Sequence, residues 1–281
     1  MHSKTTLLLL KTSTFLVFIG RAYQHLFWDA PFRSLLWDEQ LLKPIVQGLF
    51  GVKWHSYVTD LVIDSSIQSI IQLHGILYLL AAIAVVLIQP NSKRWMRIVL
   101  YLGGFNLVFL AFLLFKEKSY QIPQFFEHSL QFGVVFTLLY YLKRPNYSKL
   151  LFYLKVLIAL TFFSHGIYAL GVVYPIPSDF ITMMLNITPL TETFVIDLLF
   201  LIGVLDILLA FLIFIPKLAK WVLLYAFVWG SITALARITS GLQYEISLMI
   251  LHQYLFESLY RIVHGLIPLL AFLLTRNLSS S

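Results

Sequence analysis

The chain contains no cysteine and few charged residues. The absence of Cys among its 281 residues excludes disulfides, thiolate nucleophiles, iron–sulfur clusters and cysteine-ligated zinc. Asp, Glu, Lys and Arg make up only 12% of the sequence, whereas 59% is hydrophobic and the mean hydropathy is +0.85. A soluble domain of this size would not show this balance, so we expect an integral membrane protein.

Catalytic motifs with a recognisable spacing are also missing. The sequence has no glycine-rich phosphate loop, no nucleophile elbow and no HExxH pair. The net charge of +7 does not indicate a nucleic-acid partner, because the Lys and Arg residues are scattered singly through short loops and form no basic stripe. We therefore read the excess of positive charge as a topology signal.

Apolar runs of the length needed to cross a bilayer, about 20 residues, recur along the chain. Eight such runs predict an all-α polytopic helical bundle: 6–28, 65–89, 95–115, 123–142, 149–173, 194–215, 219–239 and 254–275. The first run continues past Lys11 and ends at Trp28 without a small-residue cleavage site. It predicts a membrane helix and not a signal peptide.

The charged loops predict the orientation. The loops after the second, fourth and sixth runs are basic, with Lys93, Arg94, Arg97, Lys143, Arg144, Lys149, Lys217 and Lys220. The opposite loops carry the acids Asp29, Asp38, Glu39, Asp60, Asp64, Asp179, Glu192 and Glu245. The positive-inside rule then places both termini in the cytoplasm, and we expect a multi-pass protein of the inner (plasma) membrane.

The two halves of the chain resemble each other. Runs two and three align with runs six and seven at an offset of 126 to 128 residues, which matches Gly75 with Gly203, Pro90 with Pro216, Trp95 with Trp221 and Gly104 with Gly230. This predicts two parallel four-helix repeats, 1–146 and 147–281, although chance similarity of Leu-rich spans is the alternative. The first half also carries a longer outer segment, 30–64, whose mixed apolar and charged residues predict amphipathic interfacial helices that could form a lid.

Polar residues inside the spans collect near the predicted outer side. Those that could contact a ligand are Arg21, His25, His74, Glu127, His128, His165, Arg237, Glu257, Arg261 and His264. Several share one helix face, as in Glu257, Arg261 and His264 at positions i, i+4 and i+7. Because ionisable groups at membrane depth are costly, we expect a polar cavity open to the outer side, with the arginines facing Glu127, Glu257 and Asp197.

A structural role is the alternative for these residues. Groups near helix ends can extend to the lipid headgroups, and interhelical hydrogen bonds can simply hold helices together. This alternative applies to Arg21, Glu127, Asp197 and Arg237, which lie close to the interface. Arg261 and His264 lie deeper, and for them a functional role is favoured. Asp206, near the centre of its span, has no polar neighbour on its own helix, so its partner must come from another helix or its carboxyl must be neutral.

The histidines in several spans raise the question of a bound haem. A b-type haem would need two facing imidazoles, and the candidate pairs combine His25 or His74 with His165 or His264. No helix carries two histidines at the spacing of a two-haem bundle, and no Glu-x-x-His pair indicates zinc or di-iron. We therefore expect no haem and no metal, and any redox role would use another bound cofactor.

Two short stretches resemble known membrane families. IGVLDILLAFLIFIPKLAKWVLL, with Gly203, Asp206, Pro216 and Lys217, resembles the second helix of DoxX-like four-helix membrane proteins; the first half has Tyr78 in place of the acid. FIGRAYQHLFWDAPFRSLLWDEQLLKP is similar to the start of the HTTM membrane domain of vitamin K-dependent gamma-carboxylase and its relatives, through Arg21, Trp37, Asp38, Glu39 and Pro44. The resemblance implies membrane redox chemistry, with quinone-linked subunits among the DoxX-like proteins, or modification of a lipid or peptide at the outer face. We expect no large soluble domain of the kind that the carboxylase carries, which argues against the carboxylase chemistry.

Three functions follow as hypotheses. The first is a redox-associated subunit whose outer cavity binds a quinone- or lipid-like ligand, held by groups such as His165, His264 or Arg261. The second is a non-catalytic subunit of a larger envelope complex. The third is a transporter of a small anion, against which the dry cytoplasmic halves of the spans argue.

Overall fold

The computed structural model describes residues 2–143, 146–242 and 248–278, and helices are the regular secondary structure found in these ranges. Arg144 and Glu245, used above to predict the topology, lie outside the described residues. The helices are α1 His2–Phe27, α2 Arg33–Leu36, α3 Glu39–Phe50, α4 Trp54–Thr59, α5 Leu61–Leu87, α6 Arg94–Glu117, α7 Ile122–Phe126, α8 Ser129–Tyr141, α9 Tyr147–Leu170, α10 Ser178–Ile187, α11 Glu192–Leu212, α12 Pro216–Leu242, α13 Leu248–Arg261 and α14 Val263–Leu278.

Within the described ranges, seven helices are long and apolar enough to cross a bilayer, and the chain is an integral membrane protein. They are α1, α5, α6, α9, α11, α12 and the α13–α14 pair, and they coincide with seven of the eight predicted runs. The remaining run, 123–142, forms two shorter helices, α7 and α8, which are interrupted at Glu127 and His128.

Local signals set several helix ends. Asn146 caps α9 by accepting a hydrogen bond from the Lys149 backbone N–H at 3.0 Å, and Gly171 ends the helix with a left-handed φ of 68°. Asp60 caps α5 in the same way through the Val62 N–H at 2.7 Å.

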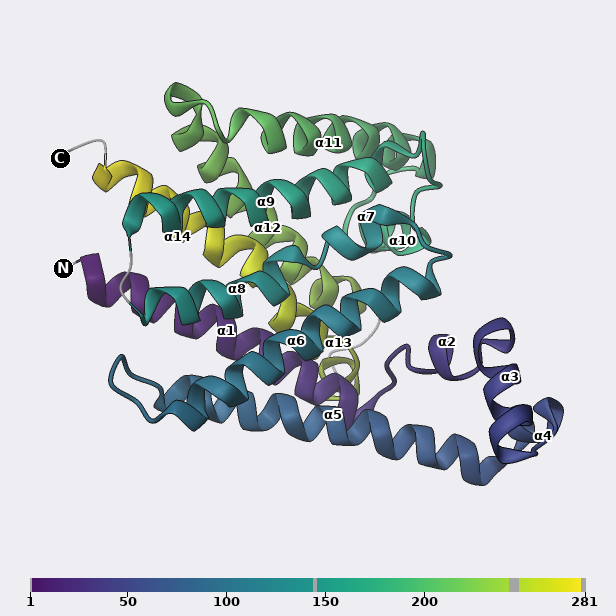
Figure 1. Ribbon diagram of the computed structural model, residues 1–281. Helices are drawn as coiled ribbons and strands as arrows, with labels where there is room; N and C mark the ends of the chain where they lie inside the picture. Colours follow the sequence, from purple (N-terminus) through teal and green to yellow (C-terminus); the bar gives the residue numbers. More distant parts are fainter. Residues whose placement is uncertain (1, 144–145, 243–247, 279–281) are drawn as a thin grey trace.

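The bundle is built around four central helices, α1, α8, α9 and α14 (Figure 1). Helices α5 and α6 cover one side and α11 and α12 the other, while one continuous apolar core runs through the centre. Glycines permit the closest helix pairs. A Cβ on Gly75 would lie 3.0 Å from His25 Cβ of α1, and a Cβ on Gly203 would lie 2.9 Å from the Gly166 carbonyl oxygen of α9.

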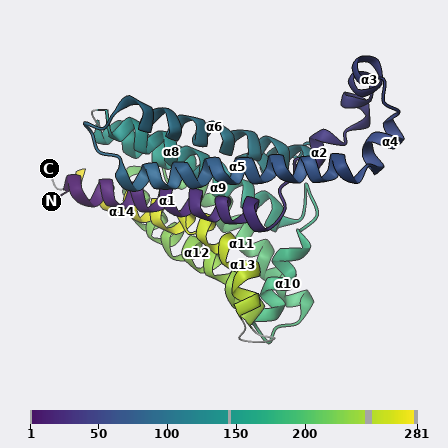
Figure 2. The ribbon, with the colours of Figure 1, turned by 90° about the horizontal axis from the view of Figure 1, so that it is seen from below.

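The two ends of the bundle differ. Both chain termini lie at one end, here called the termini end, and helices α2–α4 and α10 lie at the opposite end, here called the α10 end (Figure 1). Figure 2 shows α2–α4 extending beyond the bundle on the side of α5 and α6, apart from α10.

The segment 30–64 forms the three short helices α2, α3 and α4. Its Arg33 forms ion pairs with Asp29 and Asp64, both at 2.8 Å, and its Asp38 forms an ion pair with Lys116 of α6. The apolar side chains Leu41, Ile45, Leu49 and Phe50 of α3 are exposed, as expected for an amphipathic helix. These contacts hold the segment on the first half of the chain, against α5 and α6.

Candidate functional site

In the structure, the predicted polar residues lie in three different environments. His25 and His74 lie among aromatic rings, Arg21, Glu127 and His128 lie in the packed centre, and the rest line two cavities. The residues less than a tenth exposed are Arg21, His25, Glu127, His128, Asp206 and His264.

His25 and His74 pack beside Phe32. The rings of His74 and Phe32 are 4.7 Å apart, and His25 contacts both Phe32 and Tyr78 edge to face. His25 Nδ1 bonds the Arg21 carbonyl oxygen at 2.8 Å, and His74 Nδ1 bonds Asn106 Oδ1 at 2.6 Å. Since the Arg21 carbonyl oxygen can only accept, Nδ1 is the protonated nitrogen of the His25 ring. Neither histidine lines the cavities described below.

The guanidinium N–H groups of Arg21 donate hydrogen bonds to side chains of the protein. Its Nε and Nη2 donate to Gln131 Oε1 at 3.1 and 2.6 Å, and its Nη1 donates to Gln24 Oε1 at 2.6 Å. The guanidinium also stacks 3.7 Å above the centre of the Tyr260 ring. Arg21 thereby joins α1, α8 and α13, so the structural alternative describes this residue well.

A cavity of about 480 Å³, here called the apolar cavity, lies in the second half of the chain. Its lining residues are Phe162, His165, Ala169, Phe180, Met183, Met184, Ile187, Thr188, Leu198, Leu199, Ile202, Leu205, Asp206, Tyr225, Trp229, Ile232, Thr233, Ala236, Arg237, Arg261 and His264. They come from α9 to α14, apart from the loop residue Thr188.

Helix packing explains where this space comes from. Gly166 and Gly203 bring α11 onto α9, and Gly230 brings α12 onto α14, where an added Cβ would overlap the His264 carbonyl group. Because α11 and α12 are drawn to different partners, a gap remains between them. Leu205 and Ile232 line this gap and are also 41% and 52% exposed, so the cavity borders the lipid-facing surface of the bundle.

The α10 end of the apolar cavity is polar. His264 is 4% exposed, and neither its Nε2 nor the Nε of Arg261 has a hydrogen-bond partner among the described residues. The ring of His165 lies edge to face with that of His264, with centroids 5.5 Å apart. Leaving a buried polar atom unpaired costs about 1–3 kcal/mol, so these atoms indicate a missing acceptor or donor.

Glu127 supports this polar end from outside the cavity. Its Oε2 lies 3.9 Å from His165 Nδ1, its Oε1 lies 3.6 Å from His128 Nδ1, and its Oε1 accepts a hydrogen bond from Gln124 Nε2 at 2.9 Å. The interruption between α7 and α8 positions this carboxylate, because both it and His128 fall in the break. Glu127 therefore lies behind the histidine that lines the cavity.

The termini end of the apolar cavity holds a second polar group. Asp206 is 2% exposed and its Oδ1 accepts a hydrogen bond from the Tyr225 hydroxyl of α12 at 3.3 Å. Its partner thus comes from another helix. Tyr225 and Arg237 are separated along α12 by about 18 Å, from a rise of 1.5 Å per residue. The cavity is long, apolar in the middle and polar at both ends.

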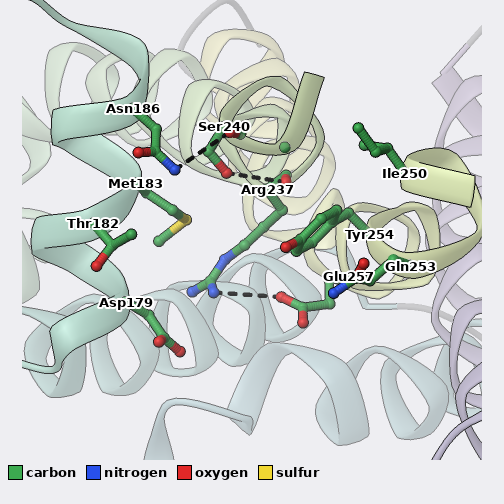
Figure 3. A pocket seen from close by; sticks show the side chains of 11 residues that line it. Asp179, Thr182, Met183, Asn186, Arg237, Ser240, Ile250, Gln253, Tyr254 and Glu257 are labelled. Carbon is green, nitrogen blue, oxygen red and sulfur yellow. Dashed lines mark hydrogen bonds and ion pairs between the residues drawn. The ribbon is translucent and has the colours of Figure 1, made fainter. Parts of the chain in front are cut away.

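A second cavity, here called the vestibule, lies at the α10 end and measures about 510 Å³ (Figure 3). It is lined by Asp179, Thr182, Met183, Asn186, Arg237, Ser240, Gly241, Ile250, Gln253, Tyr254 and Glu257. Arg237 Nη1 forms an ion pair with Glu257 Oε2 at 3.3 Å. Met183 and Arg237 line both cavities, so the two spaces are neighbours with a common wall.

The predicted pairing of arginines with acids holds for Arg237 and Glu257. Arg21 bonds glutamines, and Asp197 is exposed on α11. None of the residues that line the two cavities comes from 30–64, so α10, and not that segment, borders them. The sequence reasoning missed α10, although SDFITMMLNI lies between two proline-containing loops and alternates polar and apolar faces.

No group of three or more His, Asp or Glu side chains within the described ranges could hold a metal ion. Of the candidate haem ligands, His25 and His74 share Phe32 as a ring contact, and His165 contacts His264.

Comparison with known proteins found no matching family model, no matching curated protein and no matching solved structure. The DoxX-like and HTTM-like resemblances therefore remain predictions. Within the resembling stretches, Pro216 begins α12 and Pro44 lies inside α3.

Proposed function

We propose that this membrane protein binds an amphiphilic, lipid- or quinone-like molecule in the apolar cavity. The polar α10 end would face the outer side of the inner membrane, with both termini in the cytoplasm. The molecule's apolar part would occupy the space between α11 and α12, and its polar part would meet Arg261 and His264. A volume of about 480 Å³ is within the range of ligand sites, about 300–1,000 Å³.

The observation that carries this proposal is the pair of unpartnered nitrogens at the polar end. Arg261 Nε can only donate a hydrogen bond, whereas His264 Nε2 can donate or accept according to its tautomer. A quinone carbonyl, an ester or a phosphate oxygen would satisfy Arg261, and a hydroxyl would satisfy either. The aromatic lining from Phe162, Phe180 and Trp229 suits a ring or an acyl chain.

The resemblance to DoxX-like proteins adds membrane redox chemistry to the proposal. The ring of a bound quinone would lie beside His264. The contact of His165 with Glu127 would offer a route for protons to the quinone ring. A second candidate, a non-catalytic subunit of an envelope complex, is favoured by the exposed apolar face of α3. Transport of a small anion has less support, because the core toward the termini end is apolar.

We also propose that the fold consists of two four-helix repeats, residues 1–146 and 147–281. Supporting this, α1 pairs with α5 as α9 pairs with α11, and Gly75 and Gly203 mark the closest approach in the two pairs. The last helix of each half is also interrupted, between α7 and α8 and between α13 and α14.

Trp229 provides a test, because it lines the apolar cavity. Purified protein in phosphatidylcholine nanodiscs would be mixed with lipid carrying dibrominated acyl chains, which quench nearby tryptophan fluorescence. The Trp229 signal is the difference between the native protein and Trp229→Phe. We expect it to be quenched in a saturable way, and to be protected by unbrominated lipid or by decylubiquinone.

Two matched variants make this test specific. Ala236→Phe fills the cavity and should abolish saturable quenching, whereas Leu235→Phe, on the neighbouring exposed position, should leave it unchanged. Arg261→Gln should weaken competition by ligands that carry a polar head. Quenching that rises in proportion to the amount of brominated lipid, and that is the same in the Ala236→Phe variant, would show that Trp229 senses only the surrounding bilayer.

A further inference from the structure

The vestibule holds a set of polar groups that the proposed function does not use. A quinone ring or a simple ester at Arg261 and His264 would end at the wall formed by Met183 and Arg237. Beyond this wall lies a space of about 510 Å³, larger than one side chain or one water can explain. A ligand that fills both spaces needs a sizeable head.

The charges in the vestibule disfavour an anionic head. Arg237, 11% exposed at its side chain, is already paired with Glu257. Asp179 adds a second carboxylate on the α10 side, so the lining carries one more negative than positive group. A phosphate or carboxylate placed here would meet this excess and would have to compete with Glu257 for Arg237.

The remaining lining groups suit hydroxyls. Thr182 and Gln253 provide a hydroxyl and an amide group, which both donate and accept hydrogen bonds, while the two carboxylates accept them. Asn186 Nδ2 already donates to the Ser240 carbonyl oxygen at 3.4 Å, and Ser240 Oγ donates to the Arg237 carbonyl oxygen at 3.2 Å. The Tyr254 ring, which packs against Gly241, adds a flat apolar face beside these groups. Hydrogen-bond donors and acceptors next to the Tyr254 ring would suit a polyhydroxylated ligand ring, whose edges are polar and whose faces are apolar.

We infer that the ligand is a glycolipid: its acyl chains occupy the apolar cavity and its uncharged, sugar-like head occupies the vestibule. This inference rests on the proposed function, because the chains must enter the apolar cavity for the head to reach the vestibule. It selects the lipid class over a quinone. Arg237 marks the boundary between head and chains.

The test compares three lipids that share identical acyl chains and differ in the head, in the Trp229 quenching assay. Monoglucosyl diacylglycerol, phosphatidylglycerol and diacylglycerol would each compete with the brominated probe, and decylubiquinone would serve as the quinone reference. We expect the glucosyl lipid to compete at an amount about tenfold lower than phosphatidylglycerol or diacylglycerol, the effect of one or two net hydrogen bonds. Gln253→Ala should reduce this preference, and Gln72→Ala, on an exposed face of α5, should not.

The outcomes separate the inference from the proposed function. Saturable quenching without a preference for the glucosyl head overturns the glycolipid inference and leaves chain binding intact. Phosphatidylglycerol or decylubiquinone competing better than the glucosyl lipid also overturns it. Methyl glucoside that competes alone would show a site for free sugar and not for a lipid head. Loss of saturable quenching for every probe refutes the proposed function itself.

Discussion

The guanidinium of Arg237 and the carboxylate of Glu257 form an ion pair of 3.3 Å that joins α12 to α13. The pair lies where the vestibule meets the apolar cavity, and its side chains are 11% and 27% exposed. It is therefore partly shielded from solvent, and removing one partner would leave the other charge poorly compensated.

Glu257→Gln should destabilise the protein and change its ligand preference. We expect a loss of about 1–3 kcal/mol, below the cost of breaking a fully buried pair because Glu257 is partly exposed. The unpaired Arg237 should also raise the relative affinity for anionic lipids. Melting curves and lipid competition would measure both effects. The double variant Arg237→Gln, Glu257→Gln should recover part of the stability, and additive losses would contradict a direct coupling.

Gly203→Ala should destabilise the bundle. Its Cβ would lie 2.7 Å from the Leu170 backbone nitrogen and 2.9 Å from the Gly166 carbonyl oxygen, and backbone atoms cannot move aside as a flexible side chain can. We expect a cost of about 1–3 kcal/mol, as for overpacked cores, seen as a lower melting temperature.

Gly48→Ala is the matched control, because nothing lies within 4 Å of its Cβ position in α3. There the substitution should add about 0.5–1 kcal/mol of helix stability, seen as slower amide exchange in α3. Equal effects of the two substitutions would refute the close approach of α9 and α11.

The attachment of α3 should depend on pH through Asp38. The hydrogen bond from Lys116 holds the pKa of Asp38 below its usual range, and the Leu41 backbone N–H acts in the same direction. Because the pKa of Asp38 is lower in the folded state, its contact with Lys116 stabilises the folded state fully at pH values above the usual Asp pKa, about 3.9. This stabilisation is lost as the pH falls through the pKa that Asp38 has in the folded state. Protection of α3 amides should therefore be constant from neutral pH to about pH 5 and fall in more acidic solution.

Asp38→Asn should reproduce the acid effect at neutral pH. It removes the charge that binds Lys116, so trypsin should cleave after Lys53 faster than in the native protein. Glu39→Gln removes only an exposed ion pair with Lys43 and should have little effect. Unchanged cleavage of the Asp38→Asn variant would show that other contacts hold the segment.

Arg21→Lys should lower stability without affecting the cavity. Lysine cannot donate the two bonds that converge on Gln131 Oε1 in this geometry, nor stack flat on Tyr260, so we expect a loss of about 1–3 kcal/mol. Saturable quenching of Trp229 should persist at temperatures where the variant remains folded. A variant with native stability and no quenching would instead place Arg21 in the ligand site.

The sequence predicted the spans well because lipid demands long apolar helices, whose composition is visible without any knowledge of packing. The structure divides the fourth run into α7 and α8 at Glu127 and His128, and hydropathy does not report such an interruption. The enrichment of polar residues toward one side also corresponds to real burial, since Glu127 and His264 are buried within the described bundle.

The sequence alone could not show that these polar residues lie in different environments of the bundle. Spacing along one helix shows that Arg21 and His25 share a face, but not that Arg21 meets Gln131 or that His25 meets Phe32. Those contacts depend on which helices are neighbours, which the close approaches at small residues decide. The apolar cavity could not be predicted for the same reason. In the sequence its lining residues resemble ordinary lipid-facing residues, and only the structure shows the gap between α11 and α12.

The exposure of Leu205 and Ile232 has a consequence for how ligand concentration should be expressed. If a ligand enters between α11 and α12 from the bilayer, occupancy follows its mole fraction among lipids and not its concentration in water. A lipid present at about 1% of the membrane would half-fill the site when preferred about a hundredfold over bulk lipid, or about 2.8 kcal/mol. A change in membrane composition alone would then empty or fill the cavity.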